Sequence, residues 1–254
     1  MNLAGKCAVI TGGGRGIGAA VARTLAASGV GVLVAARSRP EVDAVAAELR
    51  AQGHRASATV ADVTRPDSVD ALVRAAREFL GDVDILINNA GSSSSAPLKR
   101  TTLDEWNRLL AVNATSTFLC TQAFLPGMLE RHWGRVVNIA SVAGLAGAKY
   151  IAAYSAAKHA VVGFTRSVAA EVEGSGVTVN AVCPGYVDTS MTEHSLERIM
   201  ETTGKSHPEA LAAVLAHSGQ TRLITADEVA RAVLRTCTGG ENGAAILLDG
   251  KGPA

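Results

Sequence analysis

The chain has 254 residues, of which 48% are hydrophobic, 19% are charged and only 4% are aromatic, and its formal net charge is +1. This length suffices for one α/β domain with a large core. The nearly neutral charge gives no sign of a surface for nucleic acid or an anionic membrane. No apolar run reaches the roughly 18 residues of a membrane span, and the amino terminus lacks the apolar region of a secretory signal.

Cysteine and histidine residues show no pattern of a metal or redox site. The four cysteines lie far apart in segments that predict buried strand or helix, and the six histidines are scattered without ligand spacing. We therefore expect reduced thiols in a cytoplasmic protein and no metal-dependent chemistry.

A glycine-rich loop follows the first predicted strand. The apolar run at 6–10 predicts a buried strand, and Thr11-Gly-Gly-Gly-Arg-Gly-Ile-Gly18 connects it to a helix that ends at about Ser28. Glycines in this context let the backbone approach a pyrophosphate, which the amino end of the helix attracts. The alternative is a tight structural turn. The candidate cofactor contacts in this loop are Gly12, Arg15, Gly16, Ile17 and Gly18.

The second strand, predicted at 31–36, indicates which cofactor would bind. In NAD-binding units an acidic residue at its end bonds the ribose 2′-hydroxyl. Here Ala36 and Arg37 stand at that point, followed by Ser38. A guanidinium without a carboxylate favours a 2′-phosphate and hence NADP(H), with Arg15 as a second cation. NAD(H) remains the alternative, in which both arginines are solvated surface residues.

Strands and helices continue to alternate. A helix is expected at 40–51, a strand at 56–60, an amphipathic helix at 66–80 and a strand at 83–87. Asp62 and Val63 follow the third strand, where the carboxylate either accepts from an adenine amino group or caps a turn. The fourth strand runs into Asn88-Asn-Ala-Gly91, and a polar loop at 92–97 follows at the same edge.

A long helical stretch is predicted from Leu103 to about Arg131, with an interruption near Pro126. Asn113 lies within it, and an asparagine inside a helix is more often exposed than functional. An apolar run at 135–140 predicts the fifth strand. The sixth strand is expected at 177–182, a final helix at 226–236 and a last strand at 244–248.

Ser141, Tyr154 and Lys158 form a candidate group for proton transfer. Tyr154 and Lys158 are four residues apart in an alanine-rich run that predicts a helix, so they share one face. Ser141 directly follows the fifth strand and is expected at the crevice where α/β proteins bind ligands. A cation near the phenol favours phenolate and lowers the tyrosine pKa. The alternative is a core tyrosine beside a surface lysine.

The pattern loosens between about Met191 and Arg222. Two short amphipathic pieces, at 195–201 and 208–217, follow the pair Pro184-Gly185, and they predict a mobile lid at about 186–222. No linker interrupts the chain, so one domain is expected over 1–254. The predicted fold class is α/β, a doubly wound, mostly parallel, Rossmann-like sheet of about seven strands with helices on both faces.

Together these motifs resemble the short-chain dehydrogenase/reductase family, in its short single-domain branch. The motifs that carry the resemblance, in the family's order and spacing, are the glycine loop, Asn88-Asn-Ala-Gly91, Asn113, Ser141, Tyr154-x-x-x-Lys158 and Pro184-Gly185. The resemblance implies hydride transfer between NAD(P)(H) and a carbonyl or secondary alcohol. The general likeness is to 3-oxoacyl-thioester reductases and polyketide-type ketoreductases.

The same resemblance implies a role for each site residue. Tyr154 acts as the acid in reduction and the base in oxidation, and Lys158 lowers its pKa and binds the nicotinamide ribose. Ser141 orients the substrate oxygen, and Asn113 holds a water that continues a proton relay. Cofactor contacts are implied at Asn89, Ala90 and Gly91 on the adenosine and ribose side, and at Pro184, Gly185, Val187 and Thr189 near the nicotinamide.

Two segments depart from the family pattern. The carboxyl-terminal run at 243–251 lacks the usual Thr-Gly-Gln and Asp-Gly-Gly, although this segment contributes to a tetramer interface in many relatives. A homo-oligomer, a tetramer by resemblance, is still expected. The stretch at 192–220 is long for the family and should shape the substrate site. A mainly apolar edge is predicted there, from Ser92–Ser95, Leu145, Tyr150, Tyr186 and Met191.

Three other functions compete with NADP(H)-dependent carbonyl reduction. The first is an NAD-dependent catabolic alcohol or 3-hydroxyacyl dehydrogenase. The second is a non-catalytic cofactor-binding regulator, which would usually have lost Ser141, Tyr154 or Lys158. The third is an epimerase or dehydratase, for which this chain is too short because those relatives carry a separate carboxyl-terminal substrate domain.

Overall fold

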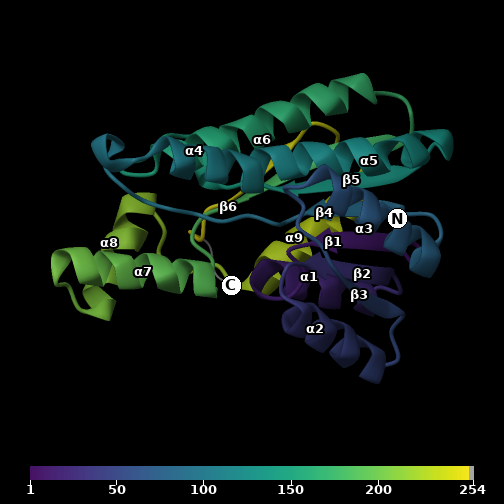
Figure 1. Ribbon diagram of the computed structural model, residues 1–254, viewed down its shortest axis with the longest axis horizontal. Coiled ribbons are helices and arrows are strands. Elements are labelled where there is room, and N and C mark those ends of the chain that lie inside the picture. Colours follow the sequence, from purple (N-terminus) through teal and green to yellow (C-terminus); the bar gives the residue numbers. More distant parts are fainter. Residues whose placement is uncertain (252–254) are drawn as a thin grey trace.

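A single parallel sheet organises the molecule (Figure 1). The computed structural model describes residues 1–251, and within them the sheet has seven strands in the order β3-β2-β1-β4-β5-β6-β7, all parallel. The strands are β1 (Cys7–Thr11), β2 (Gly31–Ala36), β3 (Ala56–Val60), β4 (Ile85–Asn88), β5 (Gly134–Ile139), β6 (Val177–Pro184) and β7 (Ala245–Leu248).

The strand order reverses between β1 and β4. The chain moves outward from β1 to β3 and then crosses back, so that Ile10 pairs in register with Ile87. Chain connections diverge at the carboxyl ends of these two strands, which leaves a crevice there. The glycine loop and the Asn88–Gly91 segment therefore meet at this edge.

Helices cover both faces of the sheet. α1 (Gly16–Ala27), α2 (Arg39–Ala51) and α9 (Ala226–Thr238) pack on one face, and α3 (Pro66–Leu80), α5 (Ser116–Glu130) and α6 (Ala152–Glu171) pack on the other. Along β1, Ala8 and Ile10 face the first group, while Cys7 and Val9 face the second. A strand buried on both faces explains the unbroken apolar run at this point of the sequence. The predicted doubly wound α/β fold is confirmed.

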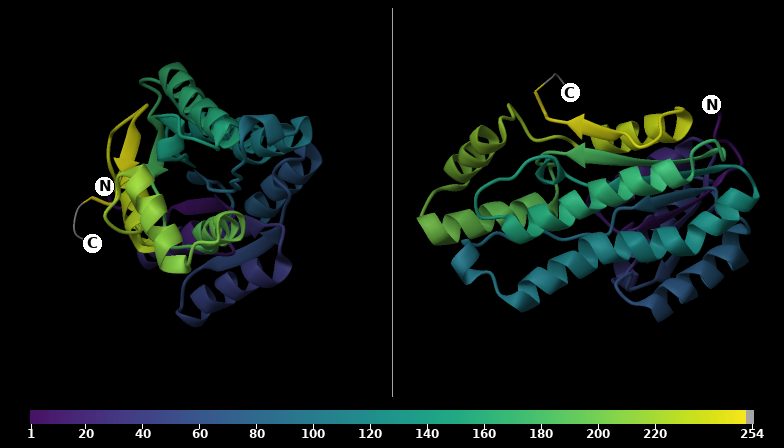
Figure 2. Two further views of the ribbon diagram at one scale, coloured as in Figure 1. Left: turned by 90° about the vertical axis from the view of Figure 1, so that its left-hand side faces the viewer. Right: turned by 90° about the horizontal axis from the view of Figure 1, so that it is seen from above.

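α7 (Ser190–Thr203) and α8 (His207–Ser218) lie beyond the carboxyl end of the sheet (Figures 1 and 2). They pack on a small cluster of their own, built on Leu196, Ala210 and Val214. Both helices end at a glycine in the left-handed region, Gly204 and Gly219. They are longer than the two pieces predicted from the sequence, because their outer turns are polar and carry little periodic signal.

The long helical stretch differs from the prediction at Pro126. α5 continues through this proline to Glu130, and the irregular turn lies earlier, as a π-helical segment η2 (Ala111–Thr115) between α4 (Leu103–Leu110) and α5. The carbonyl that loses the proline N–H belongs to Gln122, which is exposed, so water can satisfy it. No helix of the described part of the chain is long and apolar enough to cross a membrane.

Candidate active site

The glycine loop after β1 is fixed to the end of β4 by Asn89. The Asn89 Nδ2 donates to the carbonyl oxygens of Thr11 and Gly12, at 3.0 and 2.9 Å. The Thr11 Oγ1 accepts from the backbone N–H groups of Asn89 and Ala90, both at 3.1 Å. Gly12 has a φ of +63°, and a Cβ there would lie 2.8 Å from Asn89 Nδ2. Because a Cβ on Gly18 would collide with the Gly12 carbonyl, Gly18 serves helix packing.

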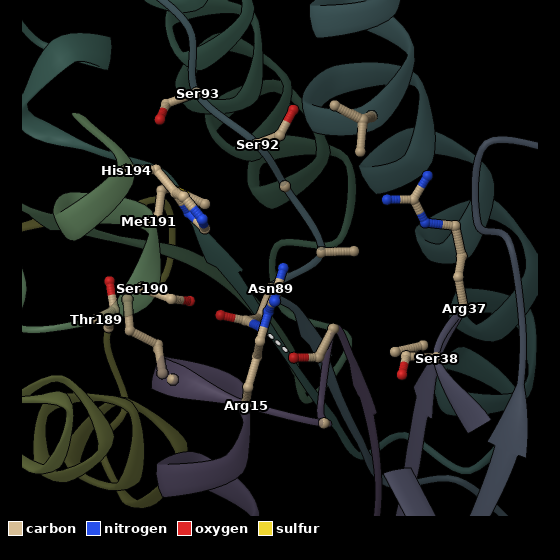
Figure 3. Close-up of a pocket in the computed structure, with 18 of the residues that line it drawn as sticks. Arg15, Arg37, Ser38, Asn89, Ser92, Ser93, Thr189, Ser190, Met191 and His194 are labelled. Carbon is tan, nitrogen blue, oxygen red and sulfur yellow. Dashed lines mark hydrogen bonds between the residues drawn. The ribbon is translucent and has the colours of Figure 1, made fainter. Parts of the chain in front are cut away.

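A cavity of about 610 Å³ runs along this edge of the sheet. Figure 3 shows Arg37 and Ser38 at one side of it and Ser92, Ser93 and His194 at the other. The predicted cofactor residues that line it are Gly12, Arg15, Gly16, Ile17, Arg37, Ser38, Asp62, Val63, Asn89, Ala90, Gly91 and Thr189.

The end of the cavity near β2 and β3 carries the cations of the predicted 2′-phosphate site. The Arg15 Nη1 lies 3.4 Å from the Glu41 Oε1, so this second cation shares its charge with a carboxylate. The Asp62 Oδ1 accepts from the Thr64 N–H and Oγ1 at 3.1 and 2.7 Å, and these bonds hold the pKa of the Asp62 carboxyl below its usual range. Asp62 therefore caps the turn after β3 and also lines the cavity, so the expected adenine contact stays a prediction.

Ser141 stands at the start of a short 3₁₀ turn, η3 (Val142–Gly144), directly after β5. Its Oγ accepts from the Ala143 N–H at 3.1 Å, and the Ser155 Oγ of α6 donates to the Ala143 carbonyl at 2.8 Å. Gly144 lets the turn lie against α6, since a Cβ there would be 2.6 Å from the Lys158 carbonyl oxygen. The turn is thus fastened to the helix that carries Tyr154, and the Ser141 hydroxyl acts to lower the pKa of the Tyr154 phenol.

Lys158 is buried, with 5% of its surface exposed. Its Nζ donates to the Ile139 carbonyl oxygen at 2.8 Å and lies 5.9 Å from the centre of the Tyr154 ring. Burial excludes the reading of Lys158 as a surface lysine. The ammonium therefore stays at the end of β5 rather than in solvent.

Asn113 completes the cluster and is 1% exposed, which corrects the expectation that a mid-helix asparagine is exposed. Its Nδ2 donates to the carbonyl oxygens of Ser92 and Leu109, both at 2.9 Å. Its Oδ1 is buried and has no partner among the described residues. A Cβ on Gly91 would lie 2.7 Å from this Oδ1 and 3.6 Å from the Lys158 Nζ. The π-helical turn thus turns a polar side chain toward the site.

Burial shifts both ionisable groups away from their charged forms. It raises the pKa of Tyr154 to about 12, against the smaller lowering effect of the Ser141 hydrogen bond. It lowers the pKa of Lys158 to about 8. The net shift of the tyrosine pKa is therefore upward, opposite to the predicted lowering, because desolvation of the phenolate outweighs the hydrogen bond with Ser141. The phenol is therefore a proton donor at neutral pH.

The far end of the cavity is more polar than the sequence suggested. Ser92–Ser95 line it, and the Arg108 Nη1 donates to the Ser92 Oγ at 2.9 Å. Met191 lines it as predicted, but Leu145 and Tyr150 are on the surface, with 38% and 62% exposed. Tyr186 packs into the cluster between α7 and α8 instead. This cavity is therefore not lined mainly by apolar residues, and the expected apolar edge around the substrate stays a prediction.

One face of α7 contributes to the cavity and was missed. Met191, His194, Ser195 and Arg198 all line it. Their spacing places them on one side of a helix, and this periodicity was the available signal in the sequence. Other lining residues that were missed are Gly14, Glu41, Thr64, Glu105, Arg108, Val112 and Ser190.

Three predicted nicotinamide contacts lie at the base of α7. Pro184 ends β6, and the Gly185 N–H donates to the Leu248 carbonyl of β7 at 2.9 Å. Val187 is buried, with 4% exposed, and forms a parallel bridge with Ile224. These residues join the sheet to the two helices that lie beyond it.

Comparisons with known proteins show the family of this chain. The family model described as short chain dehydrogenase matches residues 6–199. A 3-oxoacyl-[acyl-carrier-protein] reductase of Synechocystis is 45% identical over 193 residues, which cover 76% of this chain and 78% of the relative. A D-beta-hydroxybutyrate dehydrogenase of Rhizobium meliloti is 37% identical over 235 residues, which cover 90% of each chain.

The likeness extends to solved structures. The crystal structure of an actinorhodin polyketide ketoreductase with NADPH superposes with a TM-score of 0.92 at 36% identity, over 96% of both chains. The strand order, the glycine loop and the Ser141, Tyr154 and Lys158 cluster are thus found in a chain that aligns with reductases over most of its length. The chain belongs to the short-chain dehydrogenase family, and it is an oxidoreductase that transfers a hydride between a nicotinamide cofactor and a carbonyl or secondary alcohol.

Proposed function

We propose that this protein is an NADPH-dependent ketoreductase that acts on a 3-oxoacyl thioester or a polyketide-type ketone. The observation that carries the proposal is the cluster of the Ser141 turn, the Tyr154 phenol and the buried Lys158 ammonium, which lies 5.9 Å from the centre of the Tyr154 ring. The phenol is protonated at neutral pH, as an ordinary tyrosine is, and burial raises its pKa further, to about 12. A protonated phenol is suited to give a proton to the oxygen of a ketone as it is reduced. The printed functions of the Synechocystis and actinorhodin proteins agree with this direction of reaction.

The cavity suits a nicotinamide dinucleotide. Glycines keep side chains out of the loops that line it, since a Cβ on Gly12 would clash with Asn89 and one on Gly91 would clash with Asn113. Arg37, at the end of β2, offers a cation to a 2′-phosphate and supports NADP(H) over NAD(H). The cofactor, when bound, supplies the hydride that reaches the carbonyl carbon.

Each residue of the cluster has a distinct part in the proton transfer. Ser141 donates a hydrogen bond to the substrate oxygen, and Tyr154 gives that oxygen its proton, so that a secondary alcohol results. Lys158 is protonated below a pH of about 8 and stabilises the phenolate that remains. Asn113, whose Oδ1 has no partner within residues 1–251 and lies near Lys158, holds the water through which the proton is replaced.

The whole chain acts as one domain, with α7 and α8 as a lid over the cavity. Support comes from the separate cluster that holds these two helices and from the cavity-lining face of α7. Met191, His194 and Arg198 on that face would contact the substrate or the cofactor when it is bound. Substrate selection would then depend on the lid, while the chemistry depends on the sheet edge.

We also propose that the protein forms a homo-oligomer in the cytoplasm. Large apolar side chains are exposed on the surface near α4 and α5, with 75% of Leu98, 72% of Leu103 and 43% of Phe118 accessible. Leu247, on the edge strand β7, is 52% exposed. Such surfaces favour association with a second copy. The four free, buried cysteines suit a reducing compartment. Light scattering of the purified protein measures the mass: a tetramer is expected, and a monomer would contradict the proposal.

Cofactor binding followed by a substrate panel tests the function. NADPH and NADH are titrated by fluorescence, and the tighter one is then supplied with ketones and 3-oxoacyl thioesters. We expect tighter NADPH binding and consumption of one NADPH for each alcohol formed. Tighter NADH binding with oxidation of a 3-hydroxy acid would favour the dehydrogenase alternative. Cofactor binding without any turnover across the panel would favour a regulator.

A further inference from the structure

The two arms of the lid meet at one buried side chain, that of Gln220. The outgoing arm leaves β6 at Gly185 and leads to α7, and the returning arm comes from the end of α8 at Gly219. Gln220 is the next residue on the returning arm and is only 6% exposed. A buried carboxamide is costly unless it is hydrogen-bonded, so its partners indicate its purpose.

The carboxamide bonds the main chain of both arms. The Gln220 Oε1 accepts from the Tyr186 N–H at 2.7 Å. The Gln220 Nε2 donates to the Tyr186 carbonyl at 3.2 Å and to the Arg222 carbonyl at 3.1 Å. The side chain therefore holds the N–H and the C=O of Tyr186 at once, as a neighbouring strand would.

Two glycines leave room for this carboxamide. A Cβ on Gly185 would collide with the Gln220 Oε1, and a Cβ on Gly250 would lie 2.9 Å from the Nε2. The Gly250 carbonyl also accepts from the Thr221 Oγ1 at 2.9 Å, which brings the carboxyl-terminal segment into the same junction. Three segments that are far apart in the sequence thus close around one side chain.

Next to the Gln220 side chain, the two arms also pair through their backbones, and one of them contacts the core of the lid. The Ile224 N–H donates to the Tyr186 carbonyl at 3.0 Å, and the Asp188 N–H donates to the Ile224 carbonyl at 2.8 Å. The Tyr186 ring packs against the cluster of Leu196, Ala210 and Val214 that joins α7 to α8. Tyr186 therefore connects the lid cluster to the backbone that Gln220 holds.

We propose that Gln220 is a positioning residue that clamps the base of the lid and so places the α7 face over the cavity. Its role in turnover rests on the proposed function, since it acts through Gly185 and Val187 near the nicotinamide. Only a carboxamide supplies a neutral acceptor together with two N–H donors in one plane. Asparagine is one methylene shorter, so glutamine is the side chain that reaches across both arms.

Replacement by methionine, Gln220→Met, removes the hydrogen bonds and keeps the length of the side chain. Hydrogen exchange should show the Tyr186 amide losing protection by about tenfold or more, because its buried N–H has no acceptor. Amides of β1 and β4 should keep their protection. The exposed Gln122 on α5 provides the matched control, Gln122→Met, which should leave the Tyr186 amide unchanged.

Kinetics separate a clamp from a general structural role. For Gln220→Met we expect the KM for the ketone and the Kd for NADPH each to rise about tenfold, with kcat within about threefold of the natural enzyme. A residue that only supports folding would instead lower the melting temperature and the active fraction. In that case KM and Kd would stay unchanged, which would overturn the proposal.

A charged replacement, Gln220→Glu, gives a second test that does not depend on the stability of the methionine variant. Its carboxylate can accept from the Tyr186 N–H but cannot donate to the Tyr186 and Arg222 carbonyls. Burial raises the pKa of such a carboxyl above its ordinary value of about 4.3, and protonation restores one donor. NADPH affinity relative to the natural protein should therefore recover as the pH falls from 8 to 5.5, while the Gln220→Met ratio stays flat.

The outcomes distinguish this proposal from the proposed function. Hydrogen exchange and NADPH titration need no turnover, so they test the clamp even if the substrate panel fails. Loss of Tyr186 protection with pH-dependent recovery of NADPH affinity in Gln220→Glu supports the clamp. Unchanged Tyr186 protection in Gln220→Met, or unchanged KM and Kd in that variant, would refute it.

Discussion

The β5–α6 region and the α7–α8 lid are built in different ways. The β5–α6 region carries Ser141, Tyr154 and Lys158, and its strand lies between two large core clusters. The lid rests on Leu196, Ala210 and Val214, with four partly buried neighbours around them. The β5–α6 region is held in place by many packed core residues, whereas the lid is joined to the sheet through the segments at its base.

This difference suits a division of labour. Proton transfer needs fixed positions within fractions of an ångström, and a rigid sheet edge supplies them. Admission of a substrate needs an element that moves, and such elements come from the less stable parts of a fold. The tight contacts around Lys158 and the polar surface of α7 follow this division.

The largest expected effect is on the rigid side and separates chemistry from binding. Tyr154→Phe removes the hydroxyl and keeps the ring, so the substrate oxygen has no proton donor. Turnover should fall by about a thousandfold, while the NADPH Kd changes by less than about twofold. Steady-state NADPH oxidation and fluorescence titration measure the two quantities. The control is Tyr150→Phe at the exposed tyrosine; retained turnover in Tyr154→Phe would remove that residue from the mechanism.

A matched pair of leucine truncations tests whether the two regions are held independently. Leu86 lies in β4 and is 0% exposed, and Leu196 lies in α7 and is 1% exposed. Leu86→Ala should lower the global free energy of unfolding by about 2–5 kcal/mol. Leu196→Ala should cost less globally but speed proteolytic cleavage within 186–222. Denaturant unfolding and limited proteolysis provide the two readouts; equal global losses would mean that lid and sheet unfold as one unit.

Cofactor choice should depend on the sheet edge and not on the lid. Arg37→Ala removes the cation at the end of β2, and the preference for NADPH over NADH should fall by about tenfold or more. Arg39→Ala, in the first turn of α2, is the control, because Arg39 pairs at 3.9 Å with Asp43 and is not part of the cavity lining. The ratio of the two dissociation constants is the measurement. An unchanged ratio in Arg37→Ala would place the phosphate elsewhere.

The last expected effect is a pH dependence that reports the burial of Lys158. The pKa of this lysine is about 8 in the folded protein and 10.5 when exposed in the unfolded chain. Below pH 8 the lysine is protonated in both states, so the folded state bears the full free-energy cost of a buried ammonium. Between pH 8 and 10.5 the unfolded state binds more protons, and the free energy of unfolding rises with pH. Lys158→Met lacks this rise, so the stability advantage of Lys158→Met over the natural protein should shrink by about 1–3 kcal/mol across that range.

Denaturant unfolding of both proteins at pH 7, 8.5 and 10 measures this difference. Taking the difference cancels the other groups that titrate in the same range, among them Tyr154 with its raised pKa. A difference that stays constant from pH 7 to 10 would mean that Lys158 is solvated. The contrast between a tightly packed β5–α6 region and a less buried lid would then not hold at Lys158.

Much of the fold was predictable from local pattern. Buried strands such as β1 and β2 are unbroken apolar runs between glycine or polar residues. Such a run can be recognised in the sequence even when the neighbouring strands are unknown. The family, the doubly wound fold and the oxidoreductase class that the motifs indicated are confirmed. Where the pattern was weak, as in the polar turns of α7, the predicted boundaries were several residues short.

The sequence by itself determined which groups are available: a phenol, an ammonium and a hydroxyl in a spacing that one helix and one strand end can bring together, with Arg37 after the second strand. Only the tertiary structure decided their pKa values, because desolvation depends on everything packed around a side chain. It likewise decided that Asn113 is buried and that the Gln220 side chain bonds the backbone of Tyr186. These are contacts between segments distant in the chain, and no local periodicity records them.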